Sequence, residues 1–343
     1  MKPQIHLAGK WWPLQKEHLK AMEAACHEEW EFEAVQVLSE WWSSELKIAS
    51  STSGSTGTPK EIWHQKKSMV ESALRTIGFF DLNEGTTASL VMPARFIGGK
   101  MMLIRAIVGG WRIRIERPSR LPALGVSCDF VAMTAAQAFA LCKERPDVWS
   151  QLQMVLLGGS AVDRHVIQQM PEGPVVYESF GMTETISHFA VRQLKPSLEE
   201  LFRCLEGFEV RSHSDGTLEV ILPDRTSIKT NDIAHVNSST TFQWLGRRDD
   251  VINSGGIKIH PEQVEKALAA VIPYPFKAFG QPHPTLGTQL VLRVHVPAPP
   301  VDALRLETKW ITWAKQNLPR HHAPKKVEWK ELNQTASGKW MRP

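Results

Sequence analysis

Apolar positions follow two different periods along this chain, and the period changes from one segment to the next. Up to residue 205, short apolar runs of strand length take turns with segments that are apolar at helical spacing. We expect strands at residues 46–49, 61–64, 87–92, 111–115, 130–133, 154–157 and 175–177. We expect helices at residues 18–38, 68–79, 100–108, 134–142 and 163–170. This alternation predicts an α/β fold of mainly parallel sheets flanked by helices, with ligands bound at the carboxyl ends of the strands.

The pattern changes after residue 205. Short strands and turn residues dominate first, which predicts a β-subdomain, and a mixed α+β segment follows. The expected elements are a hairpin at 209–220, strands at 226–236, 241–245 and 290–296, and helices at 261–270 and 304–318. We place the domain boundary at Asp249. Residues 1–248 then form a large N-terminal domain, and residues 249–343 form a small C-terminal domain.

Composition narrows the class of protein. The chain has 343 residues, of which 42% are hydrophobic and 22% charged, as in soluble globular proteins. The net charge is only +4 and the basic residues are dispersed, which leaves room for a modestly basic pocket but not for a nucleic-acid surface. No apolar run approaches the ~18 residues of a transmembrane helix, and the N-terminus lacks the apolar core of a signal peptide. We therefore expect a cytoplasmic protein without membrane insertion.

Four widely spaced cysteines, Cys26, Cys128, Cys142 and Cys204, form no Cys-x-x-Cys pair. They predict reduced, mostly buried thiols and not a disulfide framework or a zinc site.

A stretch rich in glycine and hydroxyl residues, 51–60, lies between the first two predicted strands. Its glycines allow successive N–H groups to turn to one side and form an anion-binding nest, and its hydroxyls and Lys60 add donors for phosphate oxygens. The spacing is not that of a Walker A loop, because Lys60 follows Pro59 and is followed by Glu61. A flexible linker is the alternative that this stretch leaves open.

Six short motifs occur in one order along the chain. They are Ser53-Gly54-Ser55-Thr56-Gly57-Thr58-Pro59-Lys60, Tyr177…Gly181-Met182-Thr183-Glu184, Lys229-Thr230-Asn231-Asp232, Gly246-Arg247-Arg248-Asp249, Gly255-Gly256-Ile257-Lys258-Ile259 and Ser337-Gly338-Lys339. In this order the chain resembles the AMP-forming adenylate-forming ligases, which include acyl- and aryl-CoA synthetases, luciferases and adenylation domains. It departs from most members in its much shorter N-terminal region. The resemblance implies that residues 1–248 bind AMP and an acid and that residues 249–343 form a domain that rotates.

Within that superfamily, the short build and the segment from Pro93 to Arg105 look most like the o-succinylbenzoate–CoA ligases of menaquinone biosynthesis. The resemblance implies an acid activated by ATP as an acyl-adenylate and then transferred to coenzyme A. It implies ATP, Mg²⁺ and coenzyme A as cofactor and substrates.

The resemblance also assigns roles to single residues. It implies catalytic roles for Lys339, Glu184 and Thr183, with Glu184 also the ligand of Mg²⁺. It implies that the nucleotide is bound by Thr52, Ser53, Gly54, Ser55, Thr56, Gly57, Lys60, Gly159, Ser160, Ser179, Phe180, Gly181, Asp232 and Arg247. It implies that Asp249, Gly255, Gly256 and Lys258 form the hinge and the coenzyme A side of the small domain.

Each of these residues also has a structural explanation. Asp232 could form a surface ion pair with Lys229, Glu184 could cap a helix, and Tyr177 could belong to the core. The acid is expected to contact Phe96, Lys100, Arg105 and Met182. Cations in an apolar helical segment need an anion, which either an internal salt bridge or a second carboxylate of the substrate would supply.

Other functions remain open at this point. The alternatives are another aryl- or acyl-CoA ligase and a stand-alone adenylation enzyme that loads a carrier protein or an amino acid. Two further alternatives are disfavoured: a nucleotide-binding protein without catalysis by the presence of Lys339 and Glu184, and a P-loop NTPase by the spacing around Lys60. The expected partners are a small carboxylic acid, ATP and coenzyme A, with a homodimer as an open possibility. No acidic residue before Glu184 is suited to hold a substrate amine, which disfavours amino-acid activation.

Overall fold

The computed structural model describes residues 2–51, 61–125, 128–159, 161–162, 164–333 and 341–343. The chain divides into two compact units, which are described separately. Unit 1 comprises residues 1–161 and 169–207, and unit 2 comprises residues 162–168 and 208–343.

Unit 1 is built around a mostly parallel sheet. Its strands lie in the order β11 (Phe202–Cys204), β10 (His188–Lys195), β9 (Val175–Gly181), β8 (Leu152–Gly158), β7 (Cys128–Thr134), β5 (Thr87–Leu90), β6 (Arg112–Ile115), β1 (Gln4–Leu7) and β2 (Lys10–Pro13). Neighbours from β9 to β1 pair in parallel, whereas β2, β10 and β11 pair antiparallel to their neighbours. The predicted α/β class is confirmed.

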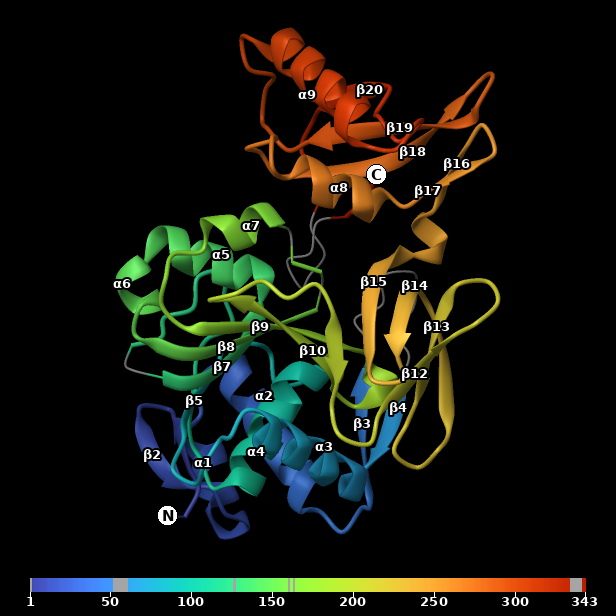
Figure 1. The fold of residues 1–343 in the computed structure, drawn as a ribbon. Helices are drawn as coiled ribbons and strands as arrows, with labels where there is room; N and C mark the ends of the chain where they lie inside the picture. The colour runs from blue at the N-terminus through green and yellow to red at the C-terminus, as the bar shows by residue number, and fades with distance from the viewer. Residues whose placement is uncertain (1, 52–60, 126–127, 160, 163, 334–340) are drawn as a thin grey trace. The chain divides into compact units, whose positions relative to one another are not determined.

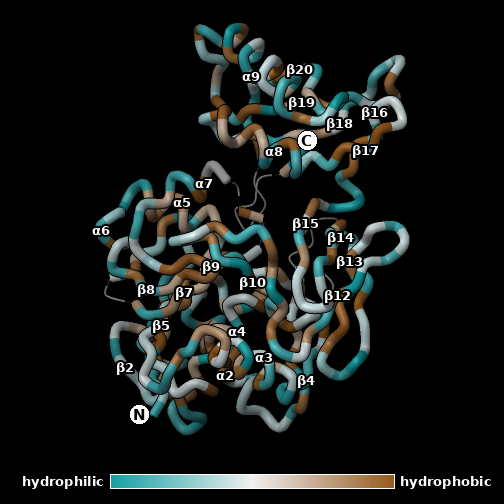
Figure 2. The backbone as a smooth tube through the Cα atoms, viewed as in Figure 1, coloured by the Kyte–Doolittle hydropathy of each residue, from teal (hydrophilic) through white to brown (hydrophobic). Residues whose placement is uncertain are grey.

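Helices cover both faces of this sheet, as Figure 1 shows. The helices α5 and α6 lie above it in that view and α2, α3 and α4 below it. The bounds are α1 (Leu19–Ala25), α2 (Glu29–Trp42), α3 (Lys66–Phe79), α4 (Ile97–Gly109), α5 (Ala135–Glu144) and α6 (Pro146–Trp149). Burial on both sides explains why the central strands read as continuous apolar runs, and Figure 2 shows these strands as largely hydrophobic.

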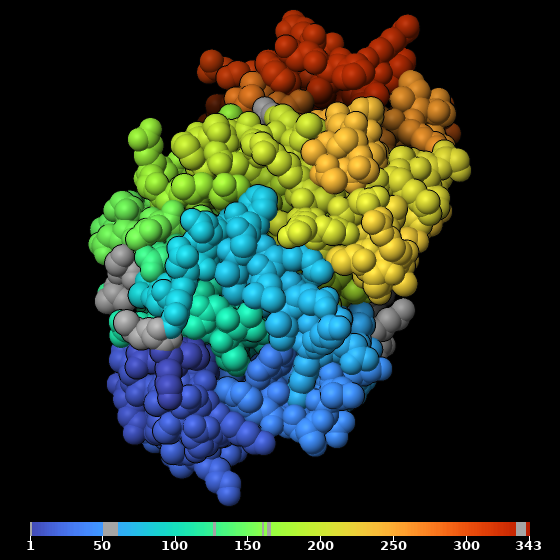
Figure 3. Space-filling model, turned by 60° about the horizontal axis from the view of Figure 1, so that its bottom comes forward, coloured from blue at the N-terminus to red at the C-terminus, as the bar shows by residue number. Residues whose placement is uncertain are grey.

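The helices below the sheet also pack on a separate hairpin. Strands β3 (Lys47–Ser51) and β4 (Glu61–Gln65) pair antiparallel. Ile48 of β3 joins buried side chains of α3 and α4 in one apolar cluster. The outer side of α3 faces solvent (Figure 3) and exposes Leu74 and Phe79.

The predicted single helix at 18–38 is wrong. The structure has a 3-10 turn, η1 (Lys16–His18), and then the separate helices α1 and α2. The interruption has a local cause: Glu28 adopts an extended conformation and caps α2, and the Glu31 carboxylate accepts from the N–H groups of His27 and Glu28 at 2.9 and 3.2 Å. Periodicity alone does not reveal a cap in the middle of an amphipathic run.

Unit 2 contains two sheets and two longer helices. The first sheet orders β12 (Glu209–Ser212), β13 (Thr217–Ile221), β14 (Ser227–Ser238) and β15 (Thr241–Arg247), all antiparallel. The second contains β16 (Ile252–Ser254), β17 (Ile257–Ile259), β18 (Phe276–His283), β19 (Gly287–Val294) and β20 (Lys326–Trp329). The helices α8 (Pro261–Leu268) and α9 (Ala303–Asn317) contribute Val264, Leu268 and Trp310 to its core. The short helix α7 (Arg164–Gln169) covers most of segment 162–168, which is also assigned to this unit.

Candidate active site

The predicted phosphate-binding stretch connects two paired strands. The β3–β4 ladder runs from Lys47 opposite Gln65 to Ser51 opposite Glu61, as the flanking apolar runs predict. The predicted nucleotide residues Thr52, Ser53, Gly54, Ser55, Thr56, Gly57 and Lys60 lie outside the described residues, as do Ser160 and Lys339.

The carboxyl ends of β8 and β9 bring several predicted adenine contacts together. The hydroxyl of Ser179 donates to the carbonyl oxygen of Leu157 on the neighbouring strand at 2.8 Å. Gly159 follows β8 with a φ of 88°, a conformation that favours glycine. The ring of Phe180 is packed edge-on against Phe189 and Phe202, so this side chain also has a structural role.

The predicted catalytic pair follows directly in the 3-10 turn η2 (Thr183–Thr185). Gly181 permits the tight exit from β9, because a Cβ there would lie 2.8 Å from the backbone nitrogen of His188. Thr183 is half-buried and Glu184 is exposed. The Glu184 carboxylate has no hydrogen-bond or ion-pair partner among the residues that the structure describes, so its oxygens are open to a hard cation.

The two cations of α4 have different surroundings. Lys100 is buried, and its Nζ donates to the carbonyl oxygen of Ala49 at 2.5 Å and lies 3.5 Å from the Glu40 carboxylate. Burial lowers the Lys100 pKa, and Glu40 opposes that effect. For Lys100 the structure therefore contains the internal salt bridge that the sequence left open.

Arg105 has no such acidic partner among the described residues. It is 2% exposed, its Nη2 donates to the Ser187 hydroxyl at 2.6 Å, and its Nε has no hydrogen-bond partner. Burial lowers the Arg105 pKa to about 10, so the guanidinium still carries its charge at neutral pH. A buried, unneutralised cation is costly and favours an anion as its ligand.

A buried histidine, His188, lies near Arg105. His188 is buried, and its ring nitrogens face the Ser187 and Thr76 hydroxyls at 3.1 and 3.4 Å. Burial first, and Arg105 second, hold the His188 pKa well below its usual value, so the ring is neutral.

Sequence reasoning missed His64 on β4. It is 5% exposed, and its buried Nε2 has no hydrogen-bond partner in the described chain. Burial lowers its pKa, with Lys100 acting in the same direction and Glu184 opposing. The available signal was its position four residues after Lys60, on the strand that directly follows the predicted phosphate-binding stretch.

The remaining acid contacts lie at the start of α4 and before η2. Phe96 is half-buried at the N-cap of α4, and the Arg95 guanidinium lies over its ring at 4.8 Å. Met182 is half-buried and caps η2. Their contact with a substrate stays a prediction.

In unit 2, the two predicted ribose contacts face each other across a ladder. Asp232 of β14 pairs in register with Arg247 of β15. Asp232 is 8% exposed and accepts from Trp244 Nε1 at 3.0 Å, whereas Lys229 bonds to Asp215 at 3.2 Å. Asp232 and Lys229, a pair left open by the sequence, thus each have another partner. Arg247 is exposed.

The hinge and coenzyme A candidates lie beyond β15. Asp249 is exposed in η3 (Arg248–Asp250) and accepts from the Asn231 amide at 3.1 Å. Gly255 and Gly256 form the two-residue turn between β16 and β17 with φ of 60° and 83°. Such a turn needs glycine for backbone reasons alone. Lys258 of β17 is exposed.

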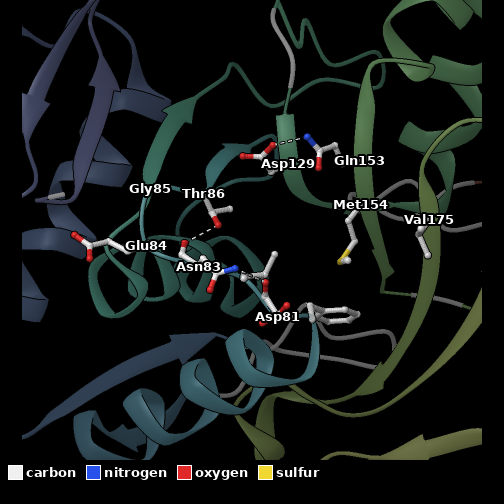
Figure 4. Close-up of a pocket in the computed structure, with 11 residues that line it drawn as sticks. Asp81, Asn83, Glu84, Gly85, Thr86, Asp129, Gln153, Met154 and Val175 are labelled. Carbon is white, nitrogen blue, oxygen red and sulfur yellow. Dashed lines mark hydrogen bonds between the residues drawn. The ribbon is translucent and has the colours of Figure 1, made fainter.

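A cavity of about 530 Å³ opens elsewhere in unit 1 (Figure 4). It lies at the amino ends of β5, β7 and β8, whereas the predicted residues of unit 1 follow the carboxyl ends of the strands. Its described lining includes no predicted site residue. The Asp129 carboxylate in its wall is satisfied, because it accepts from Gln153 at 2.8 Å and from Thr87 at 2.7 and 2.8 Å. We therefore do not assign this cavity to the reaction.

Comparison with known proteins decides the family. The sequence profile described as "AMP-binding enzyme" matches residues 14–209, more than half of the chain. The chain belongs to the AMP-binding enzyme family. This AMP-binding enzyme thus has the fold and the ordered motifs that the sequence predicts for the superfamily.

Several relatives of this AMP-binding enzyme are known. The 2-succinylbenzoate–CoA ligase of Escherichia coli is 24% identical over 317 residues, covering 85% of this chain and 66% of the relative. The enzyme of that name from Listeria monocytogenes serotype 4b is 25% identical, and the chain spans 57% of its length. The chain thus spans less than two thirds of these relatives.

Solved structures show the same fold. An acyl-CoA synthetase (AMP-forming)/AMP-acid ligase II-like protein from Dyadobacter fermentans is 29% identical with a TM-score of 0.63, and the match covers 95% of this chain and 96% of that one. The o-succinylbenzoate CoA synthetase of Bacillus subtilis, in complex with its acyl-adenylate intermediate, has a TM-score of 0.71 at 18% identity, covering 98% and 81%. No helix among the described residues combines the length and apolarity needed to cross a bilayer.

Proposed function

We propose that this AMP-binding enzyme is an AMP-forming acid–CoA ligase and that its acid is o-succinylbenzoate, in menaquinone biosynthesis. The observation that carries the choice of acid is Arg105, a buried cation with no acidic partner among the described residues. An aromatic acid with a second carboxylate would neutralise it. The names of the curated relatives support the same acid.

The proposed reaction has two steps. A carboxylate oxygen of the acid attacks the α-phosphorus of ATP, and the bond to the bridging oxygen breaks to release pyrophosphate. The thiolate of coenzyme A then attacks the acyl carbon to form the C–S bond, the bond between that carbon and the phosphate oxygen breaks, and AMP leaves with its electron pair. The net products are the thioester, AMP and pyrophosphate.

Residues of unit 1 would bind the phosphates in the first step. We assign the triphosphate to the stretch from Thr52 to Lys60 and the α-phosphate to Thr183. Mg²⁺ held by Glu184 would neutralise charge on the phosphate oxygens and needs only one or two protein carboxylates. The open carboxylate of Glu184 supports this assignment.

Residues of unit 2 would hold the ribose and deliver the last cation. Asp232 would accept from the ribose hydroxyls, and its cross-strand neighbour Arg247 would assist. Lys339 would bridge the substrate carboxylate and the α-phosphate. Rotation of residues 249–343 about Asp249 would then withdraw Lys339 and bring Gly255, Gly256 and Lys258 to the thiol arm.

The setting of the reaction is also part of the proposal. We place it in the cytoplasm, where thiols stay reduced, and four free cysteines support this choice. A homodimer is the assembly to test by light scattering on the purified chain.

The test is an exchange assay with a panel of acids. Acid-dependent exchange of labelled pyrophosphate into ATP is expected for o-succinylbenzoate, with AMP and thioester formed only when coenzyme A is added. Exchange without any requirement for free coenzyme A in product formation would favour a stand-alone adenylation enzyme. Absence of exchange with every aryl and acyl acid would refute the proposal.

A further inference from the structure

Three carboxylates hold the last arginine of the chain. Arg342 Nη1 lies 2.6 Å from Glu262 Oε1, and Nη2 lies 3.0 Å from Glu265 Oε1. Nη1 also pairs with Asp250, and Nε donates to the carbonyl oxygen of Ala278 at 2.9 Å. Only 19% of the Arg342 side chain is exposed. We call Arg342 with Asp250, Glu262 and Glu265 the Arg342 clamp.

The clamp depends on its arginine. Glu265 has two further donors, Lys277 Nζ at 3.0 Å and the Ala278 N–H at 2.8 Å. Glu262 has no lysine or second arginine beside it among the described residues, and Arg342 is the cation that faces its carboxylate. Burial raises the Glu262 pKa to about 7, and Arg342 opposes that rise more than any other group. Loss of Arg342 would leave the buried Glu262 carboxylate without its counter-charge.

Two backbone N–H groups, one on each side of segment 334–340, also donate hydrogen bonds within unit 2. The Met341 N–H donates to the carbonyl oxygen of Asn333 at 2.8 Å, and the Leu332 N–H donates to His295 Nδ1 at 2.9 Å. The described residues on either side of segment 334–340 are therefore bound to each other and to unit 2. In the sequence, Lys339 precedes Arg342 by three residues, which limits their separation along the chain to about 10 Å.

We infer that Arg342 is a positioning residue for adenylation: the clamp fixes the point on the small domain from which Lys339 reaches the nucleotide. This inference rests on the proposed function, because it uses the role assigned to Lys339. Fixing Arg342 restricts the region that a residue three positions earlier in the chain can reach, which lowers the entropy lost when Lys339 meets the reacting atoms.

A purely stabilising role would predict a different pattern of loss. The pair formed by Arg293 and Glu328 provides the comparison, because it lies in the same unit with an N···O distance of 2.8 Å and 22% exposure of the arginine. It joins β19 to β20, and among the described residues it has no hydrogen bond or ion pair with the clamp. If both arginines only stabilise unit 2, their removal should impair both half-reactions alike.

The experiment compares Arg342→Gln with Arg293→Gln in the full chain. Adenylation is measured by pyrophosphate exchange, and thioester formation by supplying the acyl-adenylate with coenzyme A. For Arg342→Gln we expect adenylation to fall on the order of tenfold to a hundredfold, while thioester formation changes less than about twofold. Arg293→Gln should leave the ratio of the two rates unchanged, and Arg342→Lys should restore part of the adenylation rate, because it keeps the charge but not the fork.

The outcomes separate the two hypotheses. If the unmodified chain catalyses exchange but Arg342→Gln lowers both half-reactions equally, the positioning role is overturned and the proposed function stands. If the unmodified chain catalyses no exchange, both are overturned. If Arg342→Gln does not fold, Glu262→Gln removes one carboxylate without leaving an unpaired charge, and it must show the same selective loss in smaller degree. Hydrogen exchange at the Met341 amide should also accelerate in Arg342→Gln.

Discussion

Arg105 and Lys100 lie on one helix, yet they meet different partners. Lys100 reaches Glu40 and the carbonyl oxygen of Ala49, whereas Arg105 reaches only neutral groups among the described residues. From the sequence, both were candidates for the second carboxylate. The structure concentrates that hypothesis on Arg105, since its charge still needs an anion.

The first prediction concerns Arg105→Met, which replaces the cation by an apolar side chain of similar length. We expect the KM for o-succinylbenzoate to rise on the order of a hundredfold, as when one partner of a buried charge pair is lost. The KM for an aromatic acid with a single carboxylate should change little. The free energy of unfolding should not fall, because an uncompensated buried charge is removed. Equal KM changes for both acids, measured by steady-state kinetics, would contradict the assignment.

The second prediction concerns pH and His188. Its pKa in the fold lies well below 6.5, so below that pH the unfolded chain binds a proton that the folded chain does not. Stability must therefore fall as the pH decreases through 6.5, by up to about 1.4 kcal/mol per pH unit from this one group. Urea unfolding of the unmodified chain and of His188→Gln at pH 5 to 8 isolates it from the other histidines. An unchanged pH slope in the variant would show that His188 titrates normally.

At the scale of elements, α4 is fixed by close backbone approach. Gly99 lies where the helix meets the preceding loop, and a Cβ there would lie 2.8 Å from the carbonyl carbon of Pro93 and overlap its oxygen. The same helix carries Arg105 two turns later. If Arg105 binds the acid as proposed, a shift of α4 at Gly99 would also displace the acid site.

The third prediction compares two glycine substitutions in helices. Gly99→Ala should lower the free energy of unfolding by about 1–3 kcal/mol, because the obstacle is backbone and not a flexible side chain. Gly78→Ala in α3 meets nothing within 4 Å and should raise stability by about 0.5–1 kcal/mol. Chemical denaturation measures both. Similar changes in the two variants would mean that α4 can shift without cost.

Elements with strong local periodicity were predictable, and those defined by pairing were not. The helices α3, α5 and α9 and the central strands agree with the predicted segments within a few residues. Strands β1 and β2, at the start of the chain, and β10 were missed. Their short or mixed sequences carry little signal, and they become strands because β6 and β9 offer free edges to pair with.

At the scale of the whole molecule, the division at Asp249 stays a prediction about motion. The contacts of the described chain separate units near residue 207, where the β-subdomain begins. The two divisions answer different questions, because a hinge is a point of rotation and need not lie where contacts are fewest.

The fourth prediction concerns Asp249→Pro, which fixes φ near −65° at the proposed hinge. We expect pyrophosphate exchange to persist while thioester formation falls at least tenfold, since only the second step needs rotation. Asp249→Ala is the matched control: it removes the bond to Asn231 without restricting φ and should spare both steps. Parallel loss of both activities in the proline variant, measured as exchange and as thioester yield, would rule out the hinge.

The sequence by itself determined the class of fold and the family, because periodicity and the order of short motifs are properties of the chain read along its length. Only the tertiary structure decided which charges are neutralised. Lys100 meets Glu40, Lys229 meets Asp215, Asp232 accepts from Trp244, and Arg342 pairs with three carboxylates. These partners lie far apart in sequence. An exposed charge is solvated by water and gains little from a partner, whereas a buried charge is costly unless a group of opposite charge lies beside it. The proposed recognition of the acid by Arg105 and the proposed role of the Arg342 clamp both depend on that difference.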